Sequence, residues 1–360
     1  MRLVRTEDAV GHVLCHDMTQ IIPKEKDGHP RFKGPRFRKG HVVTEEDVPV
    51  LLSMGKEHLY VWEVTPGMLH ENDAAERLAA LCLGCNTVAS GAPSEGKIGI
   101  NAACDGVYLV DVERLNAVNA TDEVMVATRK GNFGVHEGDA LAGTRVIPLV
   151  VREEVVQAAE RASRVDAEGP LMRVEPYRLR TAGIVTTGSE VKGGLIEDAF
   201  TPAVERKLEG YGVKATFHAM PGDDPDAIAR AIHQALDAGV DMVVCTGGMS
   251  VDPDDNTPGA IKRAGARIVT YGAPVLPGAM LLVGYFDGRQ GGCGETPAGG
   301  VPVLGLPGCV MYNAATVFDL VLPRVVAGVP LVKRDFVELG EGGLCLRCNP
   351  CTYPLCPFGK

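Results

Sequence analysis

The chain has 360 residues, of which 45% are hydrophobic and 23% charged, and its formal net charge is −10. This composition is typical of globular proteins and excludes disordered and low-complexity classes. A general nucleic-acid binder is also excluded, because neutralising phosphates requires a basic surface. No apolar run approaches the roughly 18 residues of a membrane-spanning helix, and the charged first residues are not typical of a signal peptide. We therefore expect a cytoplasmic protein with two domains, or two domains and a small third.

Residues 1–170 are predicted to form an accessory region of mixed helices and strands. Seven Lys or Arg residues lie in the segment 24–39. Two interpretations of this basic segment are open: a solvated hairpin arm, or a cationic rim for an anionic ligand. A helix capped at Thr44 is expected to run to Leu52, and residues 58–62 are typical of a strand.

Residues 70–90 have the periodicity of an amphipathic helix. Cys82 and Cys85 are three residues apart in it, so they could share one face. Such a pair could be buried as small apolar residues, or it could be a redox or metal-binding pair. The segment 165–170 is predicted to be a domain boundary.

From residue 176 to residue 330, short apolar strands alternate with amphipathic helices. The expected strands cover residues 182–186, 214–219, 241–245 and 301–306. The expected helices cover residues 200–210, 225–239, 257–265 and 309–328, and the last is interrupted at Pro323. This alternation predicts an α/β domain with a doubly wound, mostly parallel sheet. The glycine-rich run 291–300 is predicted to be the tip of a hairpin insertion.

In a doubly wound sheet, ligands bind beyond the carboxyl ends of the strands. Four loops are predicted to leave such ends, and all are rich in glycine, hydroxyl or carboxylate groups. They cover residues 187–190, 221–224, 246–255 and 307–308. We expect these loops to gather at one edge of the sheet and to form a ligand site there.

The loop 246–255 is the most informative of the four. Gly247 and Gly248 allow the backbone to approach a ligand closely and leave N–H groups available for a phosphate. Thr246 and Ser250 add hydroxyl donors. These residue types in this order are typical of a phosphate-binding turn.

Three carboxylates, Asp252, Asp254 and Asp255, follow within the same loop. Clustered like charges cost free energy unless a cation offsets them, so we expect magnesium here, with Asp254 and Asp255 as its ligands. The alternative is a solvated acidic loop whose last carboxylate helps to cap the helix that begins at Thr257.

The remaining loops carry weaker signals. Asp224 is explained by capping of the next helix, so Asp223 is the better candidate for contact with a ligand or metal. Glu190 could contact the ligand or lie on the surface. Pro307 and Gly308 precede a predicted helix whose N-terminus would favour an anion.

Taken together and in order, these loops resemble the molybdopterin-binding domain of molybdenum-cofactor biosynthesis. The resemblance covers roughly residues 179–328. Five segments in register carry it: 186–190, Asp198, 222–225, 245–251 with 255–258, and 305–308. Residues 1–170 are similar, more loosely, to the accessory domains of the two-domain molybdopterin molybdotransferases.

The resemblance implies a transferase that inserts molybdate into adenylyl-molybdopterin with magnesium and releases AMP. It implies that Glu190, Asp223 and Asp255 are the acidic catalytic residues. It also implies that the substrate-binding set is Thr187, Gly188, Ser189, Asp198, Asp224, Thr246, Gly247, Gly248, Ser250, Pro307 and Gly308. The implied partners are molybdopterin or adenylyl-molybdopterin and molybdate, within a homo-oligomer and with a molybdoenzyme as a further partner, but no nucleic acid or membrane.

The chain departs from the family at three places. Cys309 and Val310 stand where the family has Asn-Pro, and segment 276–280 lacks the lysine-proline of the family's Lys-Pro-Gly-Lys-Pro. Only about 30 residues follow Gly328, so the family's C-terminal β domain is missing. Cys309 could be a plain small residue or a thiol near bound metal.

Residues 335–360 are predicted to be a cysteine-rich metal-binding tail. We call its four cysteines, Cys345, Cys348, Cys351 and Cys356, the tail cysteines. Thiols so crowded in a reducing compartment are typical of a metal site. Zinc accepts two close cysteine pairs, whereas the first three cysteines and the proline after the fourth resemble the run that holds a 4Fe–4S cluster. Both metals are therefore open, and either would order a tail that is too short to fold alone.

The leading functional hypothesis is a molybdotransferase acting on molybdate or tungstate. The missing β domain and the altered segments favour a second hypothesis, a carrier or sensor that binds molybdopterin without catalysis. A third is a hydrolase resembling nucleotide pyrophosphatases.

Overall fold

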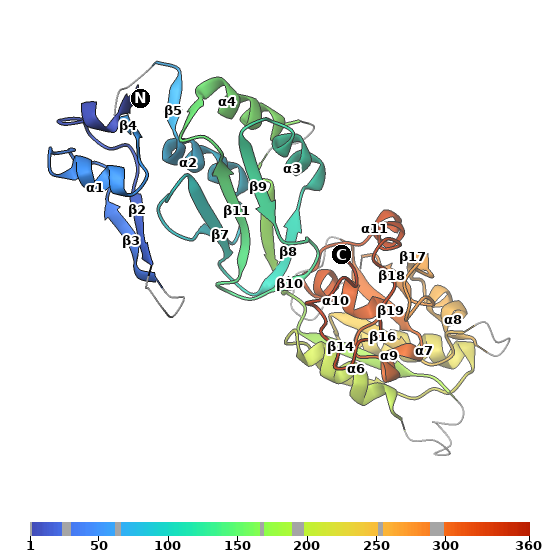
Figure 1. Ribbon diagram of the computed structural model, residues 1–360. Helices are drawn as coiled ribbons and strands as arrows, with labels where there is room; N and C mark the ends of the chain where they lie inside the picture. Colours follow the sequence, from blue (N-terminus) through green and yellow to red (C-terminus); the bar gives the residue numbers. More distant parts are fainter. Residues whose placement is uncertain are drawn as a thin grey trace. The chain divides into compact units, whose positions relative to one another are not determined.

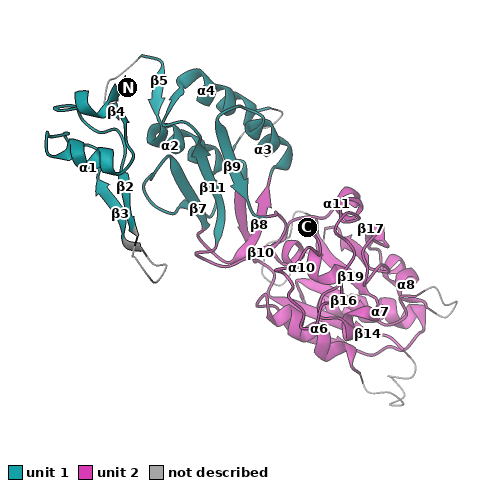
Figure 2. Cartoon of the chain, in the orientation of Figure 1, with its two compact units in different colours: residues 1–101, 111–129, 140–172 teal, residues 102–110, 130–139, 173–360 magenta. Residues whose placement is uncertain are grey.

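The structure is a computed structural model that describes residues 2–23, 30–61, 66–165, 169–188, 198–250, 255–288 and 299–360. The chain divides into two compact units (Figure 2). Unit 1 contains residues 1–101, 111–129 and 140–172. Unit 2 contains residues 102–110, 130–139 and 173–360. Among the described residues, no helix has the length and apolar character needed to cross a membrane.

Two antiparallel strand pairs and one helix form the first part of unit 1 (Figure 1). The elements are β1 (Arg2–Arg5) with β4 (His58–Val61), β2 (Met18–Pro23) with β3 (Pro30–Phe37), the 3-10 turn η1 (Thr6–Asp8) and α1 (Asp47–Ser53). The basic segment thus lies largely on the β2–β3 hairpin, although residues 24–29 are outside the described part. Helix α1 begins later than expected, because the Asp47 carboxylate accepts the Thr44 N–H at 2.9 Å and the Thr44 side chain is not the cap.

The second part of unit 1 contains a four-stranded antiparallel sheet with the order β6-β7-β11-β9, a strand pair and three helices. The strands are β5 (Met68–His70), β6 (Thr87–Ala89), β7 (Lys97–Ala102), β9 (Val124–Thr128), β11 (Ala140–Val146) and β12 (Val150–Arg152). The helices are α2 (Glu71–Cys82), α3 (Val112–Asn119) and α4 (Glu153–Ala162). Helix α2 ends at Cys82, which is buried, whereas Cys85 is exposed. The two thiols therefore do not share a helical face, and that expectation was wrong.

Unit 2 contains a small three-stranded sheet and a large mixed sheet. The small sheet has the order β10-β8-β13, with β8 (Gly106–Val110), β10 (Gly134–Val135) and β13 (Met172–Pro176). The large sheet has the order β15-β14-β16-β19-β18-β17. Its strands are β14 (Thr181–Thr186), β15 (Lys214–Ala219), β16 (Met242–Thr246), β17 (Arg267–Tyr271), β18 (Leu282–Phe286) and β19 (Val301–Leu306).

The large sheet is mixed where a mostly parallel one was expected. Strands β14, β15, β16 and β19 are parallel, as predicted, but β18 pairs antiparallel with β19 and β17 pairs antiparallel with β18. Strands β17 and β18 were not among the strands expected from the sequence. The glycine-rich run, predicted as a hairpin tip, lies almost entirely outside the described residues.

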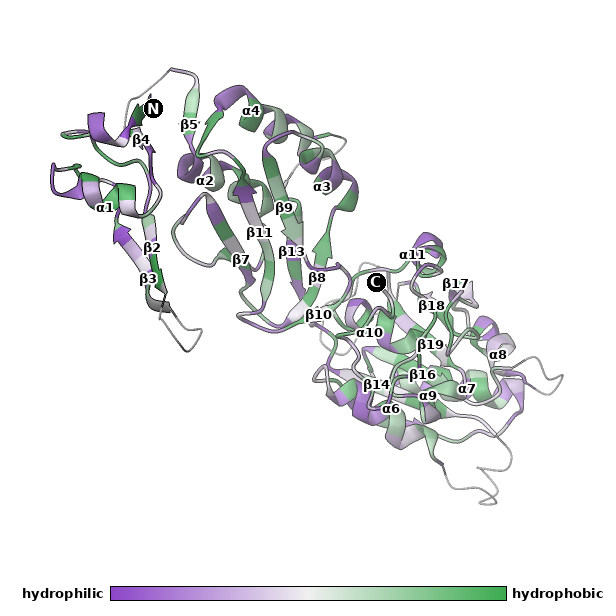
Figure 3. Ribbon diagram, viewed as in Figure 1, coloured by the Kyte–Doolittle hydropathy of each residue, from purple (hydrophilic) through white to green (hydrophobic). Residues whose placement is uncertain are grey.

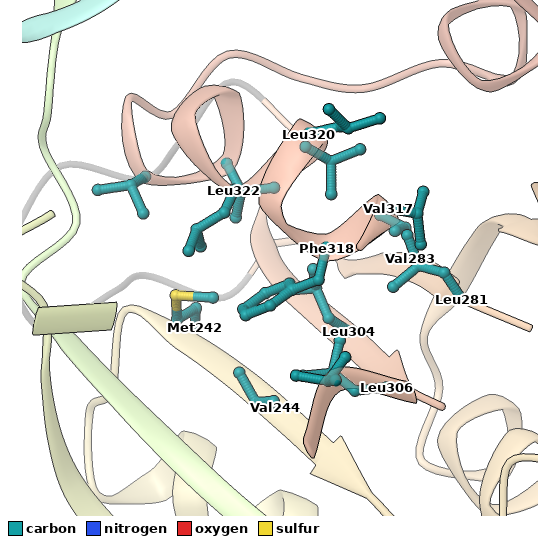
Figure 4. Packing of buried hydrophobic residues seen from close by; sticks show 14 of the residues in the cluster. Met242, Val244, Leu281, Val283, Leu304, Leu306, Val317, Phe318, Leu320 and Leu322 are labelled. Carbon is teal, nitrogen blue, oxygen red and sulfur yellow. The ribbon is translucent and has the colours of Figure 1, made fainter. Parts of the chain in front are cut away.

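Helices cover both faces of the large sheet. They are α6 (Phe200–Glu209), α7 (Pro225–Asp237), α8 (Thr257–Arg263), α9 (Cys309–Tyr312), α10 (Val317–Val326) and α11 (Lys333–Glu338). One buried cluster joins α6, α10 and α11 to the sheet, and another joins α7 and α8 to it. Colour by hydropathy follows this arrangement, with apolar strands between helices that also have a polar side (Figure 3). In the first cluster, the Phe318 ring of α10 lies between Met242 of β16 and Leu304 of β19 (Figure 4).

The expected long helix over residues 309–328 is two helices, and its break is not at Pro323. Residues 313–316 separate α9 from α10, and Pro323 lies within α10. A capping box starts α10: the Thr316 hydroxyl accepts the Phe318 N–H at 3.2 Å, and the Asp319 carboxylate accepts the Thr316 N–H at 2.7 Å. This reciprocal cap starts a new helix locally.

Candidate functional site

Several chain connections leave the large sheet at one edge. Strand β17 has the direction of β19, because each is antiparallel to β18. The strand ends are level: Thr186 pairs with Thr246, and Thr246 pairs with Leu306. The loops that follow β14, β15, β16, β17 and β19 therefore begin at a common edge, which we call the carboxyl edge. This is where ligands bind in sheets of this kind.

Buried threonines join the loop after β14 to the loop after β16. The Thr187 N–H donates to the Thr246 carbonyl at 2.8 Å, and the Thr187 hydroxyl lies 3.2 Å from the same carbonyl and 3.1 Å from the Thr257 hydroxyl. The Thr257 hydroxyl also donates to the Gly247 carbonyl at 2.9 Å. Thr187, Thr246 and Thr257 are at most 3% exposed. These hydroxyls hold the backbone of the loops in place, and their hydrogen bonds lie within the protein.

The loop after β16 requires glycine at two consecutive positions. Gly247 has φ of +83° and Gly248 has φ of +54°, a left-handed conformation that favours glycine. A Cβ atom on Gly247 would lie 2.5 Å from the Thr187 carbonyl oxygen, and one on Gly248 would lie 2.8 Å from the Thr257 hydroxyl. In the preceding loop, Gly188 also has a positive φ, of +122°. Both the conformation and the lack of space explain the two glycines after β16.

Met249 and Tyr271 hold the loop after β16 against the neighbouring strands of the large sheet. Met249 is 4% exposed, and its side chain lies so close to Gly305 of β19 that a Cβ there would be 2.6 Å from the methionine methyl. The Tyr271 hydroxyl donates to the Met249 carbonyl at 3.2 Å. Burial, together with the negative charge of Asp255, raises the pKa of Tyr271. Tyr271 therefore stays a neutral hydrogen-bond donor near that carboxylate.

Hydrogen bonds to backbone groups join the two loops that carry the candidate acidic residues Asp223 and Asp255. The Ser250 N–H donates to the Asp255 carboxylate at 2.7 Å, which closes the acidic loop. The Asn256 amide donates to the Asp223 carbonyl oxygen at 3.2 Å. The structure thus brings the loop after β15 and the loop after β16 together, with Asp223 and Asp255 on adjacent segments.

Two further predicted site residues, Asp198 and Asp224, accept hydrogen bonds from N–H groups at helix starts. The Asp198 carboxylate accepts the N–H groups of Phe200 and Thr201 at 2.9 and 3.0 Å. The Asp224 carboxylate accepts the Ala227 N–H at 2.8 Å. Each carboxylate satisfies N–H groups that a helix start leaves free. Contact of Asp198 or Asp224 with a ligand stays a prediction.

The turn after β19 does not lead into a long helix. Pro307 and Gly308 precede α9, which has four residues. A single turn has only a small aligned dipole. The helix at this position is therefore much shorter than expected, and contact of Pro307 or Gly308 with an anion stays a prediction. Cys309, at the start of α9, is half-buried.

Three predicted site residues, Ser189, Glu190 and Asp254, lie outside the described residues. Within the described part, no three Cys, His, Asp or Glu side chains stand together as a metal site. Magnesium binds through one or two carboxylates, water and substrate phosphates, so it does not need three protein ligands. Asp255 and Asp223 are both half-buried carboxylates, and magnesium binding by them stays a prediction.

Three residues of the candidate site, Tyr271, Asn256 and Thr257, make contacts that the sequence did not predict. Tyr271 was missed because β17 was not predicted. Asn256 and Thr257 lie in segment 255–258, which carries part of the family resemblance, but no contact was expected for either beyond the helix start at Thr257. The run Asp255-Asn-Thr-Pro258 held the available signal, since Asn and Thr side chains can bond to backbone groups of a neighbouring loop.

Comparisons with known proteins match the part of the chain that carries the candidate site. Residues 183–327 match a family model described as a probable molybdopterin binding domain, and residues 3–63 match a domain of unknown function. A CinA-like protein of Mycobacterium avium (strain 104) is 35% identical over 94 residues, which are 26% of this chain and 22% of that protein. A molybdopterin molybdenumtransferase of Nostoc sp. (strain PCC 7120) is 28% identical over 192 residues, which are 51% of this chain and 40% of that protein.

The chain therefore spans between about a fifth and two fifths of the length of these two relatives. Among solved structures, the molybdopterin biosynthesis enzyme MoaB from Thermus thermophilus is similar over 42% of this chain and 99% of its own, at 22% identity and a TM-score of 0.34. The resemblance inferred from the loops is confirmed by the family match: residues 183–327 form the part of this chain that matches the probable molybdopterin binding domain.

Proposed function

We propose that the carboxyl edge of unit 2 binds adenylyl-molybdopterin and inserts molybdate into it, with release of AMP. The observation that supports this proposal is the convergence of the loops after β14, β15 and β16, held together by Thr187, Thr257 and Asn256. The family match and the molybdenumtransferase relative supply the ligand class.

In this proposal the protein contributes binding and orientation. Consecutive left-handed glycines turn backbone N–H groups of Gly247 and Gly248 towards a phosphate. The Asp255 carboxylate is positioned by the Ser250 N–H, and Asp223 lies on the adjacent loop. Magnesium, held by Asp255 with Asp223 or Asp254, would offset the negative charges of these carboxylates and the substrate phosphates.

AMP release tests the proposal directly. Purified protein with adenylyl-molybdopterin, magnesium and molybdate should release AMP. Asp255→Asn should lower the rate by about 100-fold, a size typical of losing one electrostatic group in an active site. Because the Asn oxygen can still accept the Ser250 N–H, this variant should bind the pterin with nearly unchanged affinity.

The matched control is Asp287→Asn. Asp287 is exposed, pairs with Arg267 and follows β18 at the opposite edge of the sheet. The Asp287→Asn substitution also removes one negative charge from unit 2, and turnover should stay within about twofold of the wild type. Unchanged turnover in Asp255→Asn would show that the acidic loop is not part of the reaction.

A second candidate is a carrier or sensor that binds molybdopterin without converting it. The four-residue α9, with Cys309 at its start, favours this candidate, because the turn after β19 lacks a helix to bind an anion. Tight pterin binding without AMP release would decide for it. A nucleotide pyrophosphatase would instead hydrolyse a dinucleotide in the absence of molybdate.

A further inference from the structure

The tail that carries the four cysteines is anchored to unit 2. Phe358 is 2% exposed, and Tyr353 packs against the same buried cluster. The Tyr353 hydroxyl donates to the Asp319 carbonyl at the start of α10, at 3.0 Å. The Tyr353 ring also contacts the rings of Phe133 and Phe358. The tail was expected to need a metal for order because it is too short to fold alone, but aromatic packing on unit 2 already positions it.

The anchored tail forms a closed loop. The Gly359 N–H donates to the Gly342 carbonyl at 2.9 Å, so residues 343–358 leave and return at the same point. All four tail cysteines lie within this loop. The four thiols are thus confined to one short loop, in which each cysteine is at most five residues from the next.

The loop also begins at the carboxyl edge. The Cys345 N–H donates to the Leu276 carbonyl at 2.8 Å, and Leu276 lies in the connection between the end of β17 and the start of β18. Pro277, next in that connection, accepts the N–H of Val317, the first residue of α10, at 3.2 Å. The tail is therefore anchored, at Leu276 and at Asp319, near the carboxyl edge of the sheet, where the candidate site also lies.

Two of the tail cysteines are exposed, as is Cys85 of unit 1, and the other two are half-buried against the core cluster of unit 2. Cys348 and Cys351 are exposed, whereas Cys15, Cys82 and Cys245 are buried. An exposed thiol contributes nothing to a core and is prone to oxidation, so its presence needs another explanation.

The backbone turns around the first tail cysteine. Arg347 has φ of +53°, and its N–H donates to the Cys345 sulfur at 3.5 Å. The Cys348 sulfur lies 3.6 Å from the Thr352 hydroxyl. Hydrogen bonds to sulfur stabilise thiolates and tune the metals that they bind.

We propose that the four tail cysteines bind one thiophilic metal centre, zinc or an iron–sulfur cluster, beside the carboxyl edge of unit 2. The ligands bind as thiolates and release their protons. Among the described residues no three ligand side chains are already grouped, so binding has to draw the thiols inward. Residues 346–352 are all exposed, and they can move without displacing Phe358 from the core.

Metal analysis of the full chain, purified without oxygen, tests this proposal. The metal content should be about one zinc or about four iron atoms per chain, and a visible absorption band separates the cluster from colourless zinc. The single variants Cys348→Ser and Cys351→Ser should lose at least nine tenths of that metal. Cys85→Ser, which removes an exposed thiol from unit 1, should keep all of it.

Thiol reactivity gives a second readout that does not depend on folding of the variants. In metal-loaded wild type, an aromatic disulfide reagent should leave four thiols unmodified that react once a chelator removes the metal. Wild-type protein that holds no zinc or iron after reconstitution with either would overturn the proposal, as would serine variants that keep the metal. Neither outcome bears on pterin binding or AMP release, so this test is separate from that of the proposed function.

Discussion

Thr187 shows how a single hydroxyl organises the candidate site. It lies between the Thr246 carbonyl and the Thr257 hydroxyl, and it is almost completely buried. We expect Thr187→Val to lower the free energy of unfolding by about 1–3 kcal/mol, because two buried polar groups lose a partner. Chemical denaturation monitored by circular dichroism measures this loss. Thr187→Ser keeps the hydroxyl, so an equal loss in both variants would contradict the explanation.

Gly247 gives a prediction about binding. Gly247→Ala places a methyl group 2.5 Å from the Thr187 carbonyl oxygen, so the loop has to shift. The affinity for adenylyl-molybdopterin, measured by calorimetric titration, should fall at least tenfold. Gly239→Ala is the matched control: Gly239 also has a positive φ, of +77°, but no atom lies within 4 Å of its added methyl. That control should lose about 1–2 kcal/mol of stability and keep its affinity.

At the residue scale, composition and spacing indicated the acidic and glycine positions but not their partners. Asp198, Asp224 and Asp255 look alike in sequence, yet the first two bind helix N–H groups and the third binds a loop N–H. The partner of a carboxylate depends on which loop the fold brings beside it. Tyr271 could not be predicted as a site residue because its contact with Met249 spans 22 residues.

At the scale of elements, helices α2 and α4 are joined by a charged contact. Arg77 of α2 donates two hydrogen bonds to the Glu160 carboxylate of α4, at 2.7 and 2.8 Å, and a third to Glu153. These bonds from Arg77 lower the pKa of Glu160. A carboxylate whose pKa is lowered by folding stabilises the protein above its unfolded pKa, and this stabilisation is lost as the pH falls.

We therefore expect Arg77→Met to lower the free energy of unfolding at pH 7 by about 1–3 kcal/mol. The difference from the wild type should shrink as the pH falls below about 4.3, the ordinary pKa of glutamate. Urea denaturation at pH 7 and pH 4 measures both values. Arg152→Met, which breaks the exposed pair with Glu154, should cost less than about 1 kcal/mol. A difference for Arg77→Met that does not depend on pH would exclude the proposed ion pair as its cause.

The elements that sequence periodicity predicted best are those with buried apolar faces and local start signals. Helix α7 begins at Asp224 and Pro225 and ends before Gly239, as expected. Strands β17 and β18 were missed because their place is set by antiparallel pairing with β19 and not by a local signal. The break between α9 and α10 was misplaced for a related reason: Pro323 was treated as the interruption, whereas the Thr316 cap decides it.

At the scale of the whole molecule, each unit has its own buried clusters. We expect the proposed ligand to stabilise only the unit that binds it. In differential scanning calorimetry, adenylyl-molybdopterin at about 100 times its dissociation constant should add about 2.7 kcal/mol to the unit 2 transition. The unit 1 transition, identified with the Arg77→Met variant, should not move. A shift confined to the unit 1 transition would show that the ligand binds unit 1 and not the carboxyl edge of unit 2.

The division of the chain into units has a consequence for protein synthesis. Unit 2 includes residues 102–110 and 130–139 as well as everything from residue 173 onwards, and strand β8 needs β13 beside it. On the ribosome, β8 therefore cannot pair with β13 until Met172–Pro176 has been translated. The tail residue Phe358 packs into the same unit, although it is translated 182 residues after Pro176. Segments translated at widely separated times thus have to meet before unit 2 is complete.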